Sequence, residues 1–410
     1  MELLFTILLW TAGVAALSLL LLIIWGIYYD YTKTTIAPEF DHPLKLRVAH
    51  CALLIAMTLG EILARFRLCG PFFVTRFLMD LANPKIHPSL SAKDVDFDGV
   101  PVRIYQPKAP STDLRKGFVF IHGGAGVLGS IKCYQDVCSK LAKDSDSVVV
   151  AVGYHLAPEH PYPTQQKDCY TATVHFIQNA KDYGVDPSQI VIGGDSAGGT
   201  FATVVAQKLV GRPDLPRLRA QVLIYPGVQG MDINLPSYQQ NATFPLLYRR
   251  NVVYYALRYL GKDISLLDDF LKGSHVPDTL RPKYGKWVNP DIIPDRFKLR
   301  GYTRVPLASF KPDVYKKLPE TLDISFSPLF AEDSVIRQLP ETLIVSCEYD
   351  VLRDDSLLYK KRLEDNGVKV SWFHAENGFH GVINFIQPSY FQFPTGIQIM
   401  DRVAEFVKNL

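Results

Sequence analysis

A glycine-rich pentapeptide contains the side chain in this sequence that is best suited to nucleophilic catalysis, Ser196. It has the pattern G-x-S-x-G and lies between an apolar run at residues 190–192 and a helical pattern that starts at Gly198. In such a strand–turn–helix the serine hydroxyl projects above the sheet, and small residues on either side let the backbone segments approach closely. The five residues are Gly194, Asp195, Ser196, Ala197 and Gly198. We therefore predict that Ser196 is a nucleophile.

A serine hydroxyl at its ordinary pKa is a weak nucleophile, so Ser196 requires a general base. Where this motif is catalytic, the chain order is serine, then an acid, then histidine. The histidines after Ser196 are His275, which lies in a long insertion, His374 and His380. His380 follows the last predicted strand in a glycine-containing loop, at the edge of the sheet where active sites form. We predict His380 as the base, with His374, at the end of that strand, as the alternative.

The acid should follow the preceding strand, which the apolar run at residues 341–347 predicts. Asp350 lies just after that strand, whereas Asp354 and Asp355 lie at the start of a helix that we expect from about Ser356. Aspartates in that position commonly cap a helix N-terminus. We predict that Asp350 is the acid and that the other two aspartates cap the helix.

A second glycine-rich segment follows the strand predicted at residues 117–121. Its residues are His122, Gly123, Gly124 and Ala125. Acyl transfer needs backbone N–H groups that stabilise a developing oxyanion, and a glycine loop after a strand is a common source of them. We predict that Gly123 and Gly124 supply two of these groups and that Ala197 supplies the third.

Strand and helix patterns alternate along the chain, which favours an α/β fold with a mostly parallel central sheet and helices on both faces. The first two strands form a hairpin with an Asp98-Gly99 turn. Further strands are predicted at 117–121, 147–153, 189–192, 220–225, 341–347 and 368–373, and helices at 132–143, 164–179, 198–210, 356–366 and 395–408. Residues 227–340 form an insertion, which we expect to act as a cap over the site.

Composition and motifs exclude several other classes of function. The chain has 44 Lys and Arg against 41 Asp and Glu. This excess of positive charge is too small for a protein that binds the phosphate backbone of a nucleic acid. Six cysteines without a Cys-x-x-Cys pair do not indicate structural zinc. Residues 124–129 match the dinucleotide pattern G-x-G-x-x-G, but the next predicted strand, 147–153, ends without the required acid. We expect no metal ion, organic cofactor, nucleic acid or obligate protein partner.

The N-terminal segment predicts a membrane anchor. Residues 3–27 carry no charged side chain, and a helix of that length crosses a hydrocarbon core of about 30 Å. A cleaved signal peptide would have a shorter apolar core behind a basic start, whereas the residue before this segment is the acidic Glu2. Aromatic residues that prefer the membrane interface lie at the downstream edge of this segment, namely Trp25, Tyr28 and Tyr29. We expect the bilayer to be a partner of residues 3–27.

The predicted organisation has three parts. Residues 1–29 form a signal-anchor helix, residues 30–90 a stalk with membrane-proximal helices, and residues 91–410 the catalytic domain. Within the second part, the apolar run at 48–60 is too short to span a membrane. It is either a helix packed on the globular domain or a helix lying in the membrane interface.

The motifs together resemble the arylacetamide deacetylase family, in the hormone-sensitive-lipase branch of the α/β-hydrolases. The matching segments start at His122, Tyr154, Gly194, Asp350 and Asn377. The resemblance implies an α/β-hydrolase fold and a membrane-anchored serine hydrolase of small apolar carboxylic esters or aryl amides. It also implies that Ser196, Asp350 and His380 form the catalytic triad. One departure is Ala125, where the family has a glycine; a positive φ there would cost about 1 kcal/mol.

Two lines of evidence disagree on the topology of the anchor. Lys33, Lys45 and Arg47 follow the apolar segment, and the positive-inside rule then favours a cytosolic catalytic domain. A glycosylation sequon at Asn241 and the family resemblance favour the lumen of the endoplasmic reticulum. We predict a single-pass type II protein with a lumenal catalytic domain and a glycan on Asn241.

A function from another class is a non-catalytic binding or adhesion protein built on the same scaffold. Such proteins typically lose the nucleophile or the base. This chain keeps Ser196, Asp350, His380 and the glycine loop, which favours an enzyme.

Overall fold

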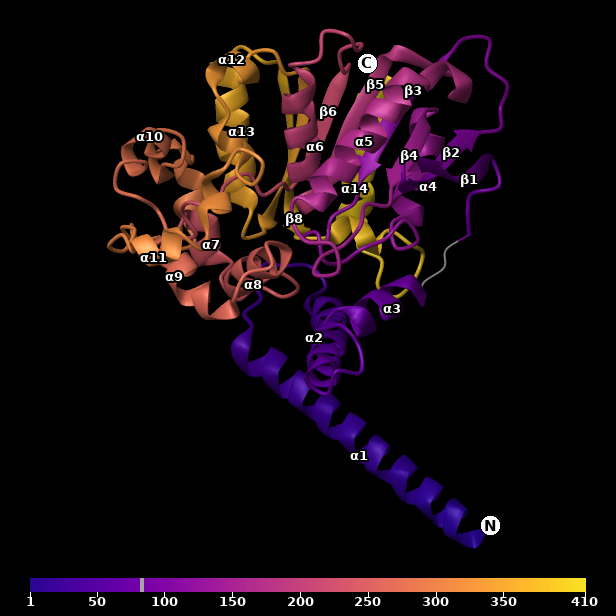
Figure 1. The fold of residues 1–410 in the computed structure, drawn as a ribbon, viewed down its shortest axis with the longest axis vertical. Helices are drawn as coiled ribbons and strands as arrows, with labels where there is room; N and C mark the ends of the chain where they lie inside the picture. The colour runs from indigo at the N-terminus through magenta and orange to yellow at the C-terminus, as the bar shows by residue number, and fades with distance from the viewer. Residues whose placement is uncertain (82–84) are drawn as a thin grey trace. The chain divides into compact units, whose positions relative to one another are not determined.

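The computed structural model describes residues 1–81 and 85–410 (Figure 1). The chain divides into two compact units. One contains residues 1–78 and 243–246, and the other contains residues 79–242 and 247–410.

A single sheet of eight strands organises the larger unit, within the described residues. Its order is β1-β2-β4-β3-β5-β6-β7-β8. The strands are β1 (Leu90–Phe97), β2 (Val100–Pro107), β3 (Arg115–Ile121), β4 (Val148–Val152), β5 (Val185–Asp195), β6 (Ala220–Ile224), β7 (Glu341–Tyr349) and β8 (Val370–Phe379). The pairs β1–β2 and β2–β4 are antiparallel and the other pairs are parallel. The predicted α/β-hydrolase fold with a mostly parallel sheet is confirmed.

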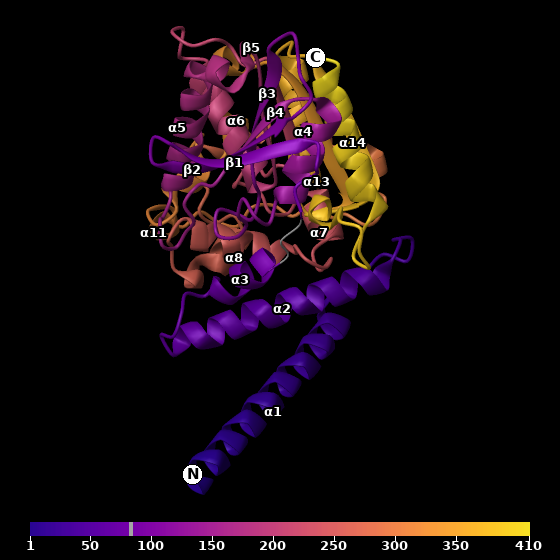
Figure 2. The same ribbon diagram turned by 90° about the vertical axis from the view of Figure 1, so that its right-hand side faces the viewer.

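Helices cover both faces of this sheet because its central strands are apolar along their whole length. In β4, for example, all five residues are buried. Helices α4 (Gln135–Ser145) and α14 (Pro394–Lys408) pack together on one face, and α5 (Thr164–Gln178) and α6 (Ala197–Leu209) pack together on the other (Figure 2). Helix α13 (Arg353–Asp365) packs on β7 and β8.

The predicted hairpin forms between β1 and β2. Phe97 pairs with Val100, which leaves Asp98 and Gly99 as a two-residue turn. Both turn residues have positive φ, 53° and 90°, as the turn type that matches the strand twist requires.

The helices of the insertion between β6 and β7 are short. They are α7 (Pro236–Gln240), α8 (Arg249–Tyr259), α9 (Leu267–Leu271), α10 (Arg281–Gly285), α11 (Pro312–Tyr315) and α12 (Asp333–Ile336). Single 3-10 turns are η2 (Ile264–Leu266), η3 (Pro290–Ile292), η4 (Asp295–Lys298), η5 (Pro319–Leu322) and η6 (Pro328–Phe330), with η1 (Ala180–Tyr183) and η7 (Val382–Phe385) outside the insertion. β6 and β7 are still neighbours in the sheet, so the insertion leaves the strand order intact.

Two element boundaries differ from the prediction in a way that matters for the site. Strand β8 continues to Phe379, so residues 377–379 are a strand and not a flexible loop. Gly378 permits this, because a Cβ there would lie 2.6 Å from Cys347 Sγ on the neighbouring strand. Helix α13 begins at Arg353 and not near Ser356.

The smaller unit contains α1 (Glu2–Lys33), α2 (Pro43–Arg65) and most of α3 (Phe73–Leu81). α1 and α2 are long and apolar enough to cross a membrane. The helix predicted from the apolar run at 48–60 is too short, because α2 extends beyond this run through polar residues at both ends. Asp30 of α1 is buried and accepts from Arg47 Nη1 and pairs with His50 Nδ1, each at 2.7 Å.

Candidate active site

Three side chains from distant parts of the sequence meet at the carboxyl ends of three strands. His380 Nε2 lies 2.8 Å from Ser196 Oγ, and His380 Nδ1 lies 2.9 Å from Asp350 Oδ2. Ser196 follows β5, Asp350 follows β7 and His380 follows β8. If Nδ1–H donates to the carboxylate, Nε2 is left to accept the serine proton. The structure therefore brings together the three residues chosen from the sequence.

The alternative histidines lie elsewhere. His374 is held between Ser346 Oγ, 2.9 Å from its Nδ1, and Glu348 Oε2, 3.2 Å from its Nε2. His275 Nε2 donates to the carbonyl of Gly230 at 2.8 Å, and burial lowers the pKa of His275 to about 4. Neither ring is hydrogen-bonded to Ser196.

Backbone strain and tight packing hold Ser196 in place. Its φ and ψ are 53° and −126°, a conformation that residues with a Cβ seldom adopt. Its N–H donates to the carbonyl of Ile224 on β6 at 2.8 Å. A Cβ on Gly194 or Gly198 would lie about 2 Å from the carbonyl oxygen of Ile121, so neither position has room for a side chain. The glycines of the motif are thus required by close backbone approach.

The glycine loop departs from the prediction at Gly123. Its N–H already donates to Asp195 Oδ1 at 2.8 Å, so it is not available to an oxyanion. By contrast, the N–H groups of Gly124, Ala125 and Ala197 donate to no group in the described part of the chain. The prediction of Gly123 as a donor is therefore wrong, and Ala125 is the available neighbour. Sequence reasoning missed this because the Gly123 bond joins residues 72 positions apart.

Ala125 adopts the left-handed conformation, with φ 56°. The glycine usual at this position would adopt it without strain, whereas alanine costs about 1 kcal/mol. The strain expected from the sequence is therefore present. Gly124 also has a positive φ, 101°, and a Cβ there would lie 2.3 Å from the carbonyl oxygen of Leu128.

Asp195 connects the glycine loop to the nucleophile. It is buried, and its Oδ2 accepts from the Tyr134 hydroxyl at 3.0 Å. Burial raises the pKa of Asp195 to about 6, although its hydrogen bonds with Tyr134 and Gly123 favour the ionised form. Tyr134 was not singled out from the sequence, because nothing near it in the chain marks it.

His122 has a structural environment. Burial lowers its pKa to about 4, which keeps the ring neutral, and its Nδ1 donates to the carbonyl of Gly123 at 2.8 Å. The Tyr154 hydroxyl donates to the carbonyl of His122 at 2.8 Å. Both side chains therefore hold the loop and leave its outward N–H groups free.

Comparison with known proteins agrees with this geometry. A family model described as alpha/beta hydrolase fold matches residues 118–273 and 304–384. Human arylacetamide deacetylase-like 3 is 46% identical over 94% of this chain and 95% of its own length, and human arylacetamide deacetylase-like 4 is 45% identical over the same shares. The chain belongs to the arylacetamide deacetylase family. Among solved structures, a thermophilic carboxylesterase from a metagenomic library is 26% identical, with a TM-score of 0.61 over 82% of this chain and 94% of that one.

In this member of the deacetylase family, buried charged residues surround Asp350, the candidate acid. Asp350 is buried; its Oδ1 accepts from the N–H of Leu352 at 2.8 Å, which leaves Oδ2 facing His380. Two residues earlier, Glu348 accepts from Arg300 at 2.9 Å and from the fully buried Arg353 at 3.0 Å. Burial alone would raise the pKa of Glu348, but hydrogen bonding with His374 and the charges of the two arginines lower it to about 2.

The predicted capping role of Asp354 and Asp355 is wrong. Helix α13 already begins at Arg353, so both aspartates lie inside its first turn. Asp354 accepts from the N–H of Ser237 at 2.7 Å and from Arg353 Nε at 3.0 Å. Asp355 accepts from the N–H of Val228 at 2.9 Å, and burial raises its pKa to about 7. Both carboxylates therefore bind the insertion to the acid side of the site.

Asn241, predicted to carry a glycan, is buried in the same region. Its Nδ2 donates to the carbonyls of Glu348 at 3.1 Å and of Asp350 at 2.9 Å, and its Oδ1 accepts from Arg300 at 3.1 Å. Only 1% of the residue is exposed. A glycan on Nδ2 would displace both hydrogen bonds, so the glycosylation prediction is wrong for the folded protein. The sequon pattern carries no information on burial.

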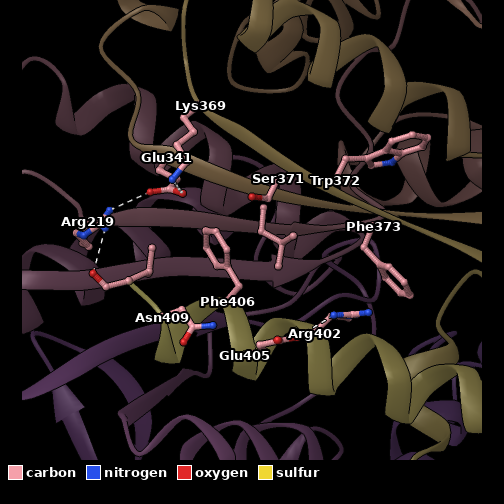
Figure 3. Close-up of a pocket in the computed structure, with 12 residues that line it drawn as sticks. Arg219, Glu341, Lys369, Ser371, Trp372, Phe373, Arg402, Glu405, Phe406 and Asn409 are labelled. Atoms are coloured by element: carbon pink, nitrogen blue, oxygen red, sulfur yellow. Dashed lines mark hydrogen bonds and ion pairs between the residues drawn. The ribbon is translucent and has the colours of Figure 1, made fainter.

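A pocket of about 510 Å³ lies away from the triad, at the opposite edge of the sheet (Figure 3). Glu341, which begins β7, contacts Lys369 Nζ at 2.7 Å and Arg219 Nη1 at 3.3 Å there. Arg402 pairs with Glu405 at 2.9 Å, so each charged side chain that lines the pocket has a partner of opposite charge. Among the described residues, no group of three His, Cys, Asp or Glu side chains is placed to hold a metal ion.

Proposed function

We propose that this protein is a membrane-anchored serine hydrolase that cleaves carboxylic esters, and also aryl amides, through an acyl-enzyme on Ser196. The observation that carries the proposal is the continuous hydrogen-bonded line from Ser196 Oγ through His380 to Asp350. The names of the family members and of the solved esterases support the substrate class.

The geometry assigns one task to each group. His380 Nε2 takes the proton of Ser196 as Oγ bonds to the substrate carbonyl carbon, and the carbonyl oxygen becomes an oxyanion held by N–H groups of Gly124, Ala125 and Ala197. The protonated ring then gives its proton to the leaving alcohol or amine, and the acyl group stays on Oγ. Water, deprotonated by the same nitrogen, releases the carboxylic acid. Asp350 holds the ring in the tautomer that this sequence needs.

The test is covalent labelling with a fluorophosphonate followed by kinetics on p-nitrophenyl esters of increasing chain length and on acetanilides. We expect labelling of the wild type and of the exposed control Ser334→Ala, and none of Ser196→Ala. Ser196→Ala and His380→Ala should each remove most of kcat, and the double variant little more, because the residues act as a unit. Labelling that persists in Ser196→Ala contradicts the assignment, and a folded wild type that neither labels nor turns over favours the binding-protein alternative.

The same proposal places α1 across the membrane of the endoplasmic reticulum and the hydrolase in its lumen, on the strength of the family. Because Asn241 is buried, the test needs a new sequon. Pro110→Asn creates one with Ser111 and Thr112 in an exposed loop. In cells, endoglycosidase H should then increase the gel mobility by one glycan, and adding Thr112→Ala should abolish the shift. No shift, with protease digestion of the hydrolase in intact microsomes, places it in the cytosol as the positive-inside rule indicates.

A further inference from the structure

The smaller unit exposes large apolar side chains beyond α1. Five of them lie between the end of α2 and the middle of α3, and we call them the 66–78 patch. They are Phe66 (74% exposed), Leu68 (71%), Phe73 (56%), Phe77 (55%) and Leu78 (47%). The rings of Phe73 and Phe77, one turn apart on α3, stack with centroids 6.4 Å apart and remain exposed. Exposed apolar groups gathered in this way mark an interaction surface.

The charges within the patch indicate what kind of surface it meets. Arg65, Arg67 and Arg76 lie among the apolar residues, and residues 62–79 contain no Asp or Glu. Arginine can keep its guanidinium at a phosphate while its stem and the neighbouring aromatic rings lie in hydrocarbon. This combination is typical of segments that lie in the boundary between lipid headgroups and acyl chains.

The patch is held firmly on α2. A Cβ on Gly60 would lie 2.2 Å from the carbonyl oxygen of Pro71, so the loop after α2 folds back into direct contact with that helix. The position of α2 therefore determines the position of the patch.

α2, in turn, is attached to α1 where α1 would leave the membrane. Gly26 of α1 packs against Ile55 of α2, and Asp30 is bonded to Arg47 and His50 (Figure 2). This crossing lies beside the aromatic residues of α1 that prefer the interface. From Ile55 to the end of α2 the helix rises about 15 Å along its own axis, so the patch begins within about 15 Å of this crossing.

We propose that the 66–78 patch lies in the headgroup boundary of the same bilayer that α1 spans, with its rings among the upper acyl chains and its arginines on anionic phosphates. The inference rests on the proposed membrane anchor. It gives the smaller unit two attachments to one membrane, one that spans it and one that lies in its surface.

Photocrosslinking of the full chain tests this directly. The chain is reconstituted in phosphatidylcholine vesicles, with or without phosphatidylserine, that contain an alkyne-tagged phosphatidylcholine. p-Benzoylphenylalanine replaces Phe73 or Phe77 in the patch, Leu19 in α1 as the positive control, or Leu299 as an equally apolar and exposed control in the larger unit. Each variant is first checked for cooperative thermal unfolding.

We expect lipid adducts at Phe73, Phe77 and Leu19, at least several-fold above Leu299. Phosphatidylserine should raise the yield at Phe73, and Arg67→Gln with Arg76→Gln should remove that increase. If Leu19 gives adducts while the yields at Phe73 and Phe77 only equal the yield at Leu299, the proposed role of the patch is wrong and the proposed anchor stands. No adduct at Leu19 overturns the anchor itself. Crosslinks from Phe73 to a second copy of the chain also overturn the proposal, since the patch would then be a protein interface.

Discussion

The two sides of the candidate active site are held in different ways. On the nucleophile side, backbone groups approach so closely that Gly194 and Gly198 leave no room for a Cβ, and Ser196 and Ala125 have positive φ. On the acid side, the loop that carries Asp350 is fixed by buried charged and amide side chains. Steric contacts between uncharged groups do not change with pH, whereas a network of carboxylates and guanidinium groups does. The acid side therefore holds most of the charged groups that can respond to pH, while Asp195, whose pKa is raised to about 6, is the titratable group on the nucleophile side.

The largest expected effect comes from the acid itself. Asp350→Asn should lower kcat about 10⁴-fold, because the imidazole loses the acceptor that fixes its tautomer. The matched control is Asp354→Asn, which removes a buried carboxylate from the same network. It should lower the free energy of unfolding by about 2 kcal/mol with kcat nearly unchanged. Steady-state kinetics and urea unfolding measure both; an inactive but folded Asp354→Asn beside an active Asp350→Asn would show that the wrong carboxylate was assigned.

The next largest effect is expected from the buried ion pair of Glu348 and Arg353, close to the acid. Glu348→Gln should lower the free energy of unfolding by about 3 kcal/mol at pH 7, because Arg353 stays buried and loses one of its two carboxylate partners. The pKa of Glu348 in the folded state is lowered to about 2. Its stabilising effect is therefore complete above pH ~5, where the unfolded chain is also ionised, and is lost as the pH falls from there toward the folded-state pKa. The gap between wild type and variant should thus be largest near pH 7 and narrow toward pH 3. If the difference in free energy of unfolding between wild type and Glu348→Gln does not change with pH, charge interactions do not hold the acid side.

A smaller effect on catalysis is expected at Asn241, which holds the backbone of the acid loop. Asn241→Ala should lower kcat about 10- to 100-fold, since the loop loses two hydrogen bonds beside Asp350 and the carboxylate moves relative to His380. Asn366→Ala, at the far end of α13, is the control and should leave kcat unchanged. An unchanged kcat in Asn241→Ala would limit Asn241 to a role in stability.

The smallest effect is expected on the nucleophile side. Ala125→Gly should raise the free energy of unfolding by up to about 1 kcal/mol, equally at pH 7 and pH 4, because it removes the left-handed strain of alanine. Turnover should be equal or higher. Thermal unfolding and ester kinetics measure both quantities, and a large loss of activity would mean that the methyl group packs in the native loop.

The sequence was most informative where one short segment determines the structure. The G-x-S-x-G motif predicted a strained turn at Ser196, and Asp98-Gly99 predicted a two-residue hairpin, because each depends on neighbouring residues. It was least informative about contacts between distant segments. The Gly123 bond to Asp195 spans 72 positions and the Asn241 bond to Asp350 spans 109, and no local pattern encodes either.

Element ends were predicted less well for a related reason. An apolar run marks only the apolar part of a helix or strand. α2 was therefore predicted too short, since its ends are polar. β8 was predicted to stop before residues 377–379, because a glycine such as Gly378 usually indicates a loop. Its close approach to Cys347 on the neighbouring strand cannot be seen in the sequence.

The strand pairing of β6 with β7 makes the insertion an exchangeable module, because its two ends emerge from adjacent strands. A segment transplanted from a relative would leave the sheet untouched and could bring a new substrate preference with it. It would also have to bring counterparts of Ser237, Asn241 and Arg300, whose side chains bond to the loop from Glu348 to Val351. If the proposed function holds, an engineered chimera that ignores those three positions would weaken the triad at the same time as it replaces the insertion.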